Sequence, residues 1–465
     1  MPAKVMAREI AWIPPLAAYQ ALRALPCPVL LDSARDGDRL GRWSYVAADP
    51  FLVLTSKDGR LTLGDRAFTG DPFAVLQRIL SHHRLVHDHD LPVPFQTGAV
   101  GWLGYDLCHH LERLPHPAAD DMAFPDLALG LYDVILAFDH AQARAWILSS
   151  GRPETAPLAV MHRQRARADA FEKRLAQARP PERQAKAASV PITSNFTREA
   201  YEAAVRKVID YILAGDIFQA NLSQRFLAAL AEGDTPFDLY LRLRERNPAP
   251  FAAFLDVGEV AIASASPERF LELRDGRVET RPIKGTRPRG STPEDDARLG
   301  RELLASEKDR AENVMIVDLL RNDLSRVCRD HSVRTPEICA LESFATVHHL
   351  VSTVTGELKE GLDAVDLLRA TFPGGSITGA PKIRAMEIIA ELEPTARGPY
   401  CGAIGWLGFD GWMDTSITIR TFAIKGRKVA FQAGGGIVAD SDPAAEYQET
   451  LDKARALIEA LQGAA

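Results

Sequence analysis

Acidic side chains at helical spacing are the first residues in this sequence that could do chemistry. Glu312 lies in a segment whose apolar residues recur as on the buried face of a helix, and Asp309 precedes it by about one turn. The C-terminal segment repeats the arrangement, because Glu446, Glu449 and Lys453 stand at i, i+3 and i+7. Two predicted helices therefore each present a pair of carboxylates on one side.

Carboxylates that converge from separate helices suit a hard cation such as Mg²⁺. This ion prefers oxygen ligands, keeps several of its waters and takes only one or two carboxylates from a protein. The commoner explanation for acidic residues at helical spacing is a solvated helix face. On spacing alone, both interpretations stay open.

Two glycine-rich segments could bring a ligand close to the backbone. The segment 372–382 has the glycine spacing of a phosphate loop, but Ala380 and Pro381 stand where such a loop needs lysine and a hydroxyl residue. It predicts either free N–H groups at a helix start, which favour an anion, or a tight turn. The run Gly434-Gly435-Gly436 ends a strand predicted over 429–432 and could expose N–H groups to a carboxylate, with a structural bulge as the alternative.

A lysine beside a predicted glycine turn at the end of a strand is the fourth feature. Lys284 lies within the segment 281–287, sixteen residues after Glu268. A lysine in such a place is normally a solvated charge. If it were desolvated beside a cation, its amine would be neutral and could attack carbon, and Glu268 could supply a proton to a leaving hydroxyl.

The elements that must position these residues have recognisable ends. Thr197 is the expected N-cap of a helix that ends near Gly215. Strands are expected over 260–264, 269–273 and 278–281, with a hairpin turn at Asp275-Gly276. Three further helices are expected to begin at Thr292-Pro293, at Ser306 with a capping-box acid at Asp309, and at Asp442-Pro443.

Composition bounds the function class. A polar, proline-containing connector over 179–194 separates an N-terminal region, 1–178, from a region 195–465 that holds every feature above. A formal charge of −7 and a pI near 6.0 argue against nucleic acid as a partner. We expect a cytoplasmic protein without a membrane partner, because there is neither a signal peptide nor a membrane-length apolar stretch. The five scattered cysteines are expected to be reduced thiols.

Taken together, these segments resemble the chorismate-utilising enzymes, the family that includes the large subunits of anthranilate synthase and aminodeoxychorismate synthase. The resemblance spans about 195–457, and more loosely the N-terminal region. It implies an α/β fold of the α+β type, with two large antiparallel sheets packed face to face, helices outside and the site in a cleft. The motifs that carry it are Ser266-Pro267-Glu268-Arg269-Phe270, the run 309–323 ending in Asp318-Leu319-Leu320-Arg321-Asn322-Asp323, the segment 372–382, and Glu446-Tyr447-Gln448-Glu449-Thr450.

The resemblance also implies a role for each candidate residue. Glu312 and Glu449 would hold Mg²⁺, with Asp309 and Glu446 as acids behind them. Lys284, Glu268 and His349 would be catalytic, with His349 beside the substrate ring. The substrate-binding positions that the resemblance implies are Gln219, Thr286, Tyr400, Arg420, Gly434, Gly435, Gly436 and Lys453.

Two positions indicate the reaction within this family. Relatives that add water carry a lysine base where this chain has Gln219, and a neutral amide cannot deprotonate water, whereas ammonia needs no base. Anthranilate synthases typically have alanine where Lys284 stands, and aminodeoxychorismate synthases have this lysine. The resemblance thus implies attack of Lys284 on C2 of chorismate, loss of the C4 hydroxyl assisted by Glu268 and Mg²⁺, and then amination at C4 to 4-amino-4-deoxychorismate, a precursor of 4-aminobenzoate and folate.

Two alternatives and one partner complete the expectations. The alternatives are an anthranilate synthase component I, which releases anthranilate and pyruvate, and a catalytically silent anion-binding subunit. No cysteine lies in a glycine-flanked nucleophile turn, so a separate glutamine amidotransferase subunit would supply the ammonia. The segment Leu30-Leu31-Asp32-Ser33 is similar to the place where relatives bind tryptophan.

Overall fold

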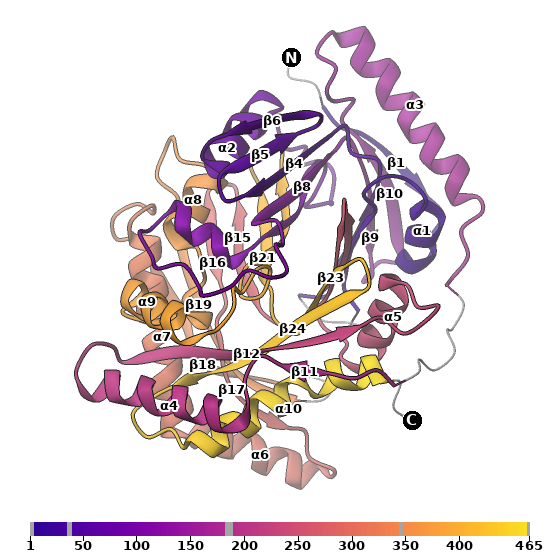
Figure 1. Cartoon of the computed structure of the whole chain (residues 1–465). Coiled ribbons are helices and arrows are strands. Elements are labelled where there is room, and N and C mark those ends of the chain that lie inside the picture. The colour runs from indigo at the N-terminus through magenta and orange to yellow at the C-terminus, as the bar shows by residue number, and fades with distance from the viewer. Residues whose placement is uncertain (1–3, 35–39, 182–188, 344–346, 463–465) are drawn as a thin grey trace.

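Two large antiparallel sheets packed face to face form the frame of the protein (Figure 1). The computed structural model describes residues 4–34, 40–181, 189–343 and 347–462. The first sheet contains β1 (Met6–Ile10), β2 (Val29–Asp32), β3 (Trp43–Ala47), β9 (Val134–Asp139), β10 (Arg144–Ser149), β11 (Thr193–Ser194), β12 (Gln219–Ala229), β13 (Phe251–Val257), β14 (Val260–Ser266), β20 (Gly379–Ala380), β23 (Thr421–Lys425) and β24 (Lys428–Ile437). The second contains β4 (Leu52–Lys57), β5 (Arg60–Leu63), β6 (Arg66–Thr69), β7 (Gly98–Leu103), β8 (Leu127–Tyr132), β15 (Arg269–Arg274), β16 (Arg277–Thr280), β17 (Ile283–Pro288), β18 (Arg334–Ser343), β19 (Val347–Glu357), β21 (Ala403–Gly408) and β22 (Met413–Ile417).

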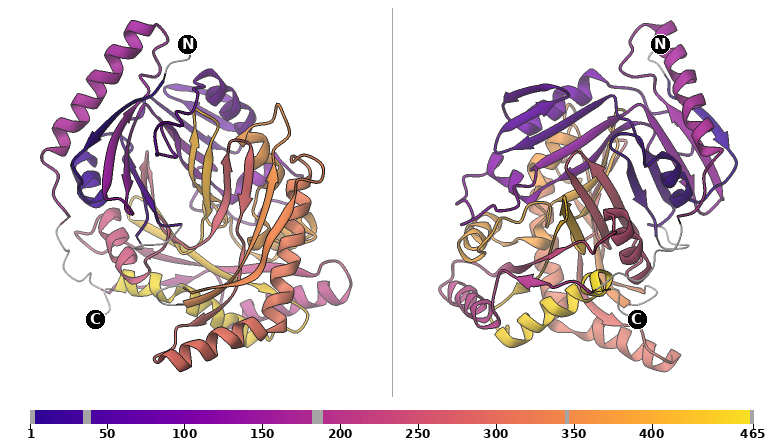
Figure 2. Two further views of the ribbon diagram at one scale, coloured as in Figure 1. Left: turned by 180° about the vertical axis from the view of Figure 1, so that it is seen from behind. Right: turned by 45° about the vertical axis from the view of Figure 1, so that its right-hand side comes forward.

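Helices lie outside the sheets, with α3 standing out at one corner (Figure 2). They are α1 (Pro15–Leu22), α2 (Pro72–His82), α3 (Pro157–Leu175), α4 (Arg198–Leu213), α5 (Pro236–Arg246), α6 (Pro293–Ala305), α7 (Glu307–Ser325), α8 (Ala364–Thr371), α9 (Lys382–Leu392) and α10 (Pro443–Gln462), with short 3₁₀ turns η1 (Tyr105–His110) and η2 (Gly375–Ile377). No helix in these ranges combines the length and apolarity that crossing a bilayer requires. The arrangement confirms the predicted fold.

Both sheets contain strands from each side of the predicted connector. The first sheet runs β1-β10-β9-β3-β2-β13-β14-β23-β24-β12-β11, and β2 pairs with β13 across the divide. The second runs β17-β19-β16-β15-β22-β21-β7-β8-β4-β5-β6, and β7 pairs with β21 in the same way. The boundaries 1–178 and 195–465 stay predictions about sequence regions, and residues 182–188 of the connector lie outside the described ranges.

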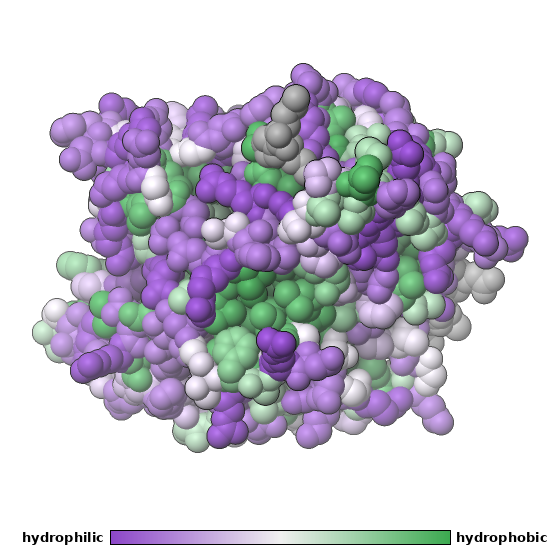
Figure 3. All heavy atoms as spheres, turned by 90° about the horizontal axis from the view of Figure 1, so that it is seen from above, coloured by the Kyte–Doolittle hydropathy of each residue, from purple (hydrophilic) through white to green (hydrophobic). Residues whose placement is uncertain are grey.

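The main hydrophobic core fills the space between the sheets. Aromatic side chains from both layers meet there, as where Phe95 stacks on Trp406 at 4.6 Å and Tyr45 packs edge-on against Phe95. Two further clusters lie between the first sheet and its covering helices. Seen from above, the surface is largely hydrophilic around an apolar hollow (Figure 3). The cysteines described are free thiols, as expected.

Local signals placed several helix starts and one hairpin turn correctly. The Thr197 hydroxyl accepts a hydrogen bond from Ala200 N at 3.2 Å and begins α4, and the Asp442 carboxylate accepts one from Ala445 N at 2.8 Å as α10 begins. Asp275 and Gly276 both have positive φ, +48° and +76°, as a two-residue hairpin turn between β15 and β16 requires.

The capping box predicted at Ser306 is only half formed. The Ser306 hydroxyl accepts a hydrogen bond from Asp309 N at 3.3 Å, so α7 begins where expected. The Asp309 carboxylate pairs instead with Arg287 on β17 at 3.0 Å. A charged partner on a neighbouring strand therefore takes the carboxylate that a capping box would use.

Candidate active site

One cavity of about 760 Å³ collects most of the predicted site residues. It lies between β17 and β19 of the second sheet, β12 and β24 of the first, and the helices α7 and α10. The predicted residues that line it are Glu268, Lys284, Thr286, Asp309, Glu312, His349, Tyr400, Arg420, Gly434, Gly436, Glu446, Glu449 and Lys453. The fold thus brings together residues that are spread over almost two hundred positions of sequence.

Lys284 enters the cavity from β17. Its Nζ donates a hydrogen bond to the carbonyl oxygen of Ser376 at 3.2 Å. Burial lowers the pKa of Lys284, and the opposing attraction of Glu312 does not outweigh this effect. This shift makes the neutral amine, which is the nucleophilic form, more accessible than in an exposed lysine.

The sequence predicted that the glycine beside Lys284 marks a turn at the end of a strand, and this prediction is wrong. Gly285 forms a bulge inside β17, with φ of +78°, and the register of β17 against β19 shifts there. A Cβ at this position would lie 3.0 Å from side-chain atoms of Asp309 and Leu303. Glycine is therefore needed for the close approach of β17 to the helices that carry the acidic residues.

Glu268 lies between β14 and β15 and is buried beside the lysine. Burial raises its pKa to about 7, even though the Ser376 hydroxyl and Lys284 both act to lower it. A carboxyl group with this pKa can hold a proton near neutral pH and release it during a reaction. Ser376 contacts both groups, yet sequence reasoning did not single it out. Its position within the motif 372–382 was the sequence feature that could have identified it.

The segment 372–382 contains a tight turn, while an anion at the start of α9 stays a prediction. The N–H groups of Ile377 and Thr378 donate to the carbonyl oxygens of Gly374 and Gly375 within η2, so neither is free for a ligand. Lys382 is used structurally as well. Its Nζ donates to the buried Asp323 carboxylate and to two carbonyl oxygens of the turn, those of Thr371 and Pro373.

Three carboxylates from two helices face the same part of the cavity. Burial raises the pKa of Glu312 on α7 and of Glu446 on α10, and each is repelled further by Glu449. Burial also acts to raise the pKa of Glu449, but its 2.7 Å ion pair with Lys453 outweighs this and leaves the pKa below its usual value. The Lys453 Nζ also donates to Gly434 O at 2.9 Å.

This donor set fits Mg²⁺. No group of three or more His, Cys, Asp or Glu side chains forms a closed metal cluster within the described ranges. A pair of carboxylates such as Glu312 and Glu449 suits a cation that completes its shell with water and substrate oxygens. A Cβ at Gly435 would lie 3.0 Å from Glu446 Oε2 and 3.4 Å from Glu449 Oε1, so glycine leaves room for both carboxylates.

The three glycines do not end their strand, which corrects the prediction of a strand over 429–432. β24 continues to Ile437, and Gly434, Gly435 and Gly436 pair with Ser223, Leu222 and Asn221 of β12. Low strand propensity suggested an end, but pairing with a long neighbour overrides it. In the described part of the chain, β23 pairs with β24 only to Phe431, so the opposite backbone edge of the glycines is open beside the cavity.

Two predicted residues lie away from the cavity lining. A side chain at Gly435 would point toward Glu446 and Glu449 of α10, as described above. Gln219 is buried behind Gly436, and a Cβ on that glycine would lie 1.8 Å from Gln219 Nε2. Sequence reasoning missed Asn221, which lies two residues further along β12 and lines the cavity. Gln219 Oε1 and Asn221 Oδ1 are buried acceptors without a hydrogen-bond partner in the described structure.

The residues predicted to face the substrate ring and carboxylate are also placed together. Thr286 Oγ1 and His349 Nδ1 lie 2.9 Å apart across β17 and β19. Tyr400 is buried with the Arg397 guanidinium 5.8 Å from its ring centre. Arg420 follows β22 with φ of +51°, a strained conformation that persists only where the surroundings enforce it.

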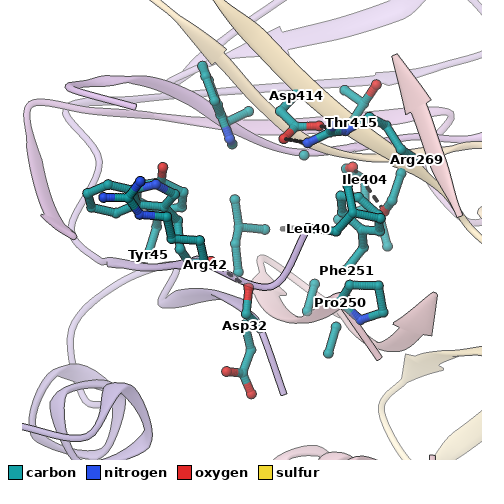
Figure 4. A pocket seen from close by; sticks show the side chains of 18 of the residues that line it. Asp32, Leu40, Arg42, Tyr45, Pro250, Phe251, Arg269, Ile404, Asp414 and Thr415 are labelled. Carbon is teal, nitrogen blue, oxygen red and sulfur yellow. Dashed lines mark hydrogen bonds and ion pairs between the residues drawn. The ribbon is translucent and has the colours of Figure 1, made fainter. Parts of the chain in front are cut away.

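A second, smaller pocket of about 90 Å³ lies between the sheets (Figure 4). Leu31, Asp32 and Ser33 of the segment similar to the tryptophan-binding place of relatives line it, and Arg269 pairs with Asp414 on its opposite wall. Glu268 and Arg269 are consecutive residues that face different pockets, because successive side chains of extended backbone point to opposite sides.

This fold and this cavity define a chorismate binding enzyme. The model of that family matches residues 27–459, and the chain belongs to it. The chain is 44% identical over 448 residues to aminodeoxychorismate synthase component 1 of Escherichia coli (strain K12), covering 96% of this chain and 95% of that protein. It is 45% identical over 453 residues to anthranilate synthase component 1 of Thermus thermophilus, with the same coverage of both chains. The crystal structure of anthranilate synthase component I from Streptococcus pneumoniae TIGR4 superposes with a TM-score of 0.80 at 34% identity, covering 91% of this chain and 93% of that one.

Proposed function

We propose that this protein aminates chorismate at C4 to give 4-amino-4-deoxychorismate. The observation that carries the proposal is the placement of Lys284 in the cavity, with its amine desolvated, close to the buried Glu268. Relatives of both kinds are equally similar in sequence, so overall identity does not choose between amination at C4 and anthranilate formation. The lysine favours the first, because the family pattern has alanine there in anthranilate synthases.

The proposed reaction begins with Lys284. Its neutral Nζ forms a bond to C2 of the ring, the ring double bonds shift, and the C4–O bond breaks. Glu268 gives its proton to the departing hydroxyl, which leaves as water. Ammonia then forms a bond to C4, the double bonds shift back, and the C2–Nζ bond breaks. Lys284 leaves as a free amine, and Glu268 regains its proton from the ammonium group formed at C4, so the protein is unchanged.

Ammonia as the nucleophile fits the surroundings of β12. Gln219 and Asn221 present carbonyl oxygens that accept hydrogen bonds but cannot remove a proton from water. Because both of these β12 side chains are amides, they favour a nucleophile that is already reactive. A separate glutamine amidotransferase as the source of ammonia is part of the proposal. It is supported by relatives that are named component 1. A cytoplasmic location stays a prediction.

Glu312 and Glu449 would hold Mg²⁺, which when bound would offset the charge of a substrate carboxylate. Arg420, Tyr400 and Lys453 would bind the carboxylates of chorismate, with Arg420 able to form a bidentate pair. Thr286 and His349 would lie beside the ring. These groups would fix the substrate against Lys284, so that much of the rate gain would come from positioning.

A trapping experiment tests the proposal. The protein is incubated with chorismate and Mg²⁺ without ammonia, then digested and analysed by mass spectrometry. An adduct on the peptide that contains Lys284 is expected, and Lys284→Ala should form none. Lys207→Ala is the matched control, because Lys207 is an exposed lysine paired with Glu391.

Product analysis tests the alternative. With ammonium salt added, the product should remain non-fluorescent until a lyase that releases 4-aminobenzoate is supplied. Fluorescent anthranilate formed without any lyase would identify an anthranilate synthase. Full amination activity of Lys284→Ala with free ammonia would disprove the covalent route.

A further inference from the structure

Arg420 makes its side-chain contact with a neutral group. Its Nη1 donates a hydrogen bond to Asn247 Oδ1 at 3.1 Å, and this is the single protein partner of the guanidinium within the described ranges. Burial lowers the pKa of Arg420, and no acidic residue in the described ranges offsets that effect. A buried guanidinium without a carboxylate is energetically costly unless an anion is bound, so Arg420 carries a positive charge that no described carboxylate pairs with.

Asn247 is itself fixed on two sides. It ends α5, where its N–H donates to Leu243 O at 2.9 Å. Its Nδ2 donates to Ala265 O at 3.3 Å, while Ala265 N donates to Arg420 O at 3.1 Å. The Asn247 amide therefore connects the Arg420 side chain to Ala265 of β14. The backbone of Arg420 is hydrogen-bonded to the same residue.

The backbone of Arg420 explains why such a support is needed. A non-glycine residue at φ of +51° costs free energy, and it persists only where neighbouring contacts enforce it. A long guanidinium side chain also loses considerable rotamer freedom when it is held in one direction. The contact with Asn247 stabilises one direction of the side chain before any ligand arrives.

We propose that Asn247 is a positioning residue that aims Arg420 into the cavity while leaving its charge free for an anionic ligand. An aspartate of the same shape would also orient the guanidinium, but it would neutralise it and compete with the ligand. The neutral amide is therefore the essential feature. This inference rests on the proposed function, since the ligand is taken to be a carboxylate of chorismate.

The test compares Asn247→Asp with Asn247→Ala in the full chain, using steady-state kinetics with chorismate and ammonium salt. Asn247→Asp should raise the KM for chorismate about tenfold, with kcat changed by less than about threefold, because the new ion pair must be broken before substrate binds. Asn247→Ala should raise the KM by a smaller factor, since it removes orientation but adds no charge. Asn195→Asp is the matched control, because Asn195 bonds to Thr395 and to Arg225 N away from the cavity.

A double-variant cycle separates positioning from a general effect on folding. If Asn247 acts through Arg420, adding Asn247→Asp to Arg420→Gln should cause no further loss in kcat/KM. Equal losses in both backgrounds would overturn the inference, as would a KM for Asn247→Asp that matches Asn195→Asp. Should Asn247→Asp unfold, the same cycle with Asn247→Ala decides. Isothermal titration of the unaltered protein with chorismate separates the role of Asn247 from the proposed function. If chorismate does not bind, the proposed function is wrong, whatever Asn247 does.

Discussion

The carbonyl oxygen of Ser376 accepts a hydrogen bond from Lys284 Nζ at 3.2 Å, while the hydroxyl of the same serine interacts with Glu268. One residue of a tight turn thus contacts both the amine and the carboxyl group of the proposed reaction. A substitution of Ser376 leaves its carbonyl oxygen in place but can remove its hydroxyl. The pKa of Glu268 can therefore be changed without replacing Glu268 itself.

The activity of the protein should fall as pH rises through about 7, which is the pKa of Glu268. The carboxyl group must be protonated to donate to the leaving hydroxyl, and it is protonated below its pKa. A pH profile of kcat/KM for chorismate, at saturating ammonia, measures this limb. A profile that stays flat across neutral pH would contradict the role of Glu268 as the acid.

Ser376→Ala should move this descending limb to higher pH. The Ser376 hydroxyl stabilises the ionised form of Glu268, so its removal raises the pKa of the carboxyl group further. The measurement is the same pH profile, recorded for the variant. Ser332→Ala, at an exposed hydroxyl that bonds Arg329 O, should leave the limb in place. A shift to lower pH would show that the sign of this interaction is wrong.

Glu312→Gln and Glu449→Gln should each lower kcat/KM by about 100-fold and raise the Mg²⁺ concentration needed for half-maximal activity. The amide keeps the shape of each side chain but removes the charge that would hold the cation. Activity as a function of added Mg²⁺ measures both effects. Glu459→Gln is the control on α10, because Glu459 interacts with Arg246 away from the cavity. Unchanged Mg²⁺ dependence in both variants would remove these residues from the metal site.

Asp106→Asn should stabilise the protein at alkaline pH. Burial, with repulsion from Asp126, raises the pKa of Asp106 to about 7 in the folded state. A carboxyl group whose folded pKa is raised favours the folded state below its unfolded pKa, and this contribution is lost as pH rises through the folded value. Asparagine stays neutral and can still accept the hydrogen bond from Gly398 N. Urea unfolding at about pH 8 should give a gain of about 2–4 kcal/mol that disappears near pH 4. No gain at the higher pH would contradict the assignment.

Lys382→Met should destabilise the turn over 372–382 and lower the free energy of unfolding by about 3–5 kcal/mol, because it leaves the buried Asp323 carboxylate without its partner. Adding Asp323→Leu should restore part of the loss. Chemical unfolding measures both variants. Lys207→Met, at an exposed ion pair, should cost less than about 1 kcal/mol. Equal effects of the two lysine substitutions would show that the turn is not anchored in this way.

Local chemistry made much of this protein predictable from sequence. The N-caps at Thr197 and Asp442 and the Asp275-Gly276 turn depend on neighbouring residues alone, and the structure confirms each. The four motifs likewise pointed to one family and to two antiparallel sheets. The cavity is lined by most of the site residues that the resemblance implied, from Glu268 to Lys453. Their individual roles stay predictions.

Contacts between distant segments decided the rest. The three glycines continue β24 because a long partner strand pairs with them, and the Asp309 carboxylate turns to Arg287 because β17 lies beside α7. Ser376, Asn221 and Asn247 joined the site only when the chain folded, since each gains its importance from a partner far away in sequence. Spacing along a chain fixes which side of an element a residue occupies. Only the packing of the sheets decides what that side meets.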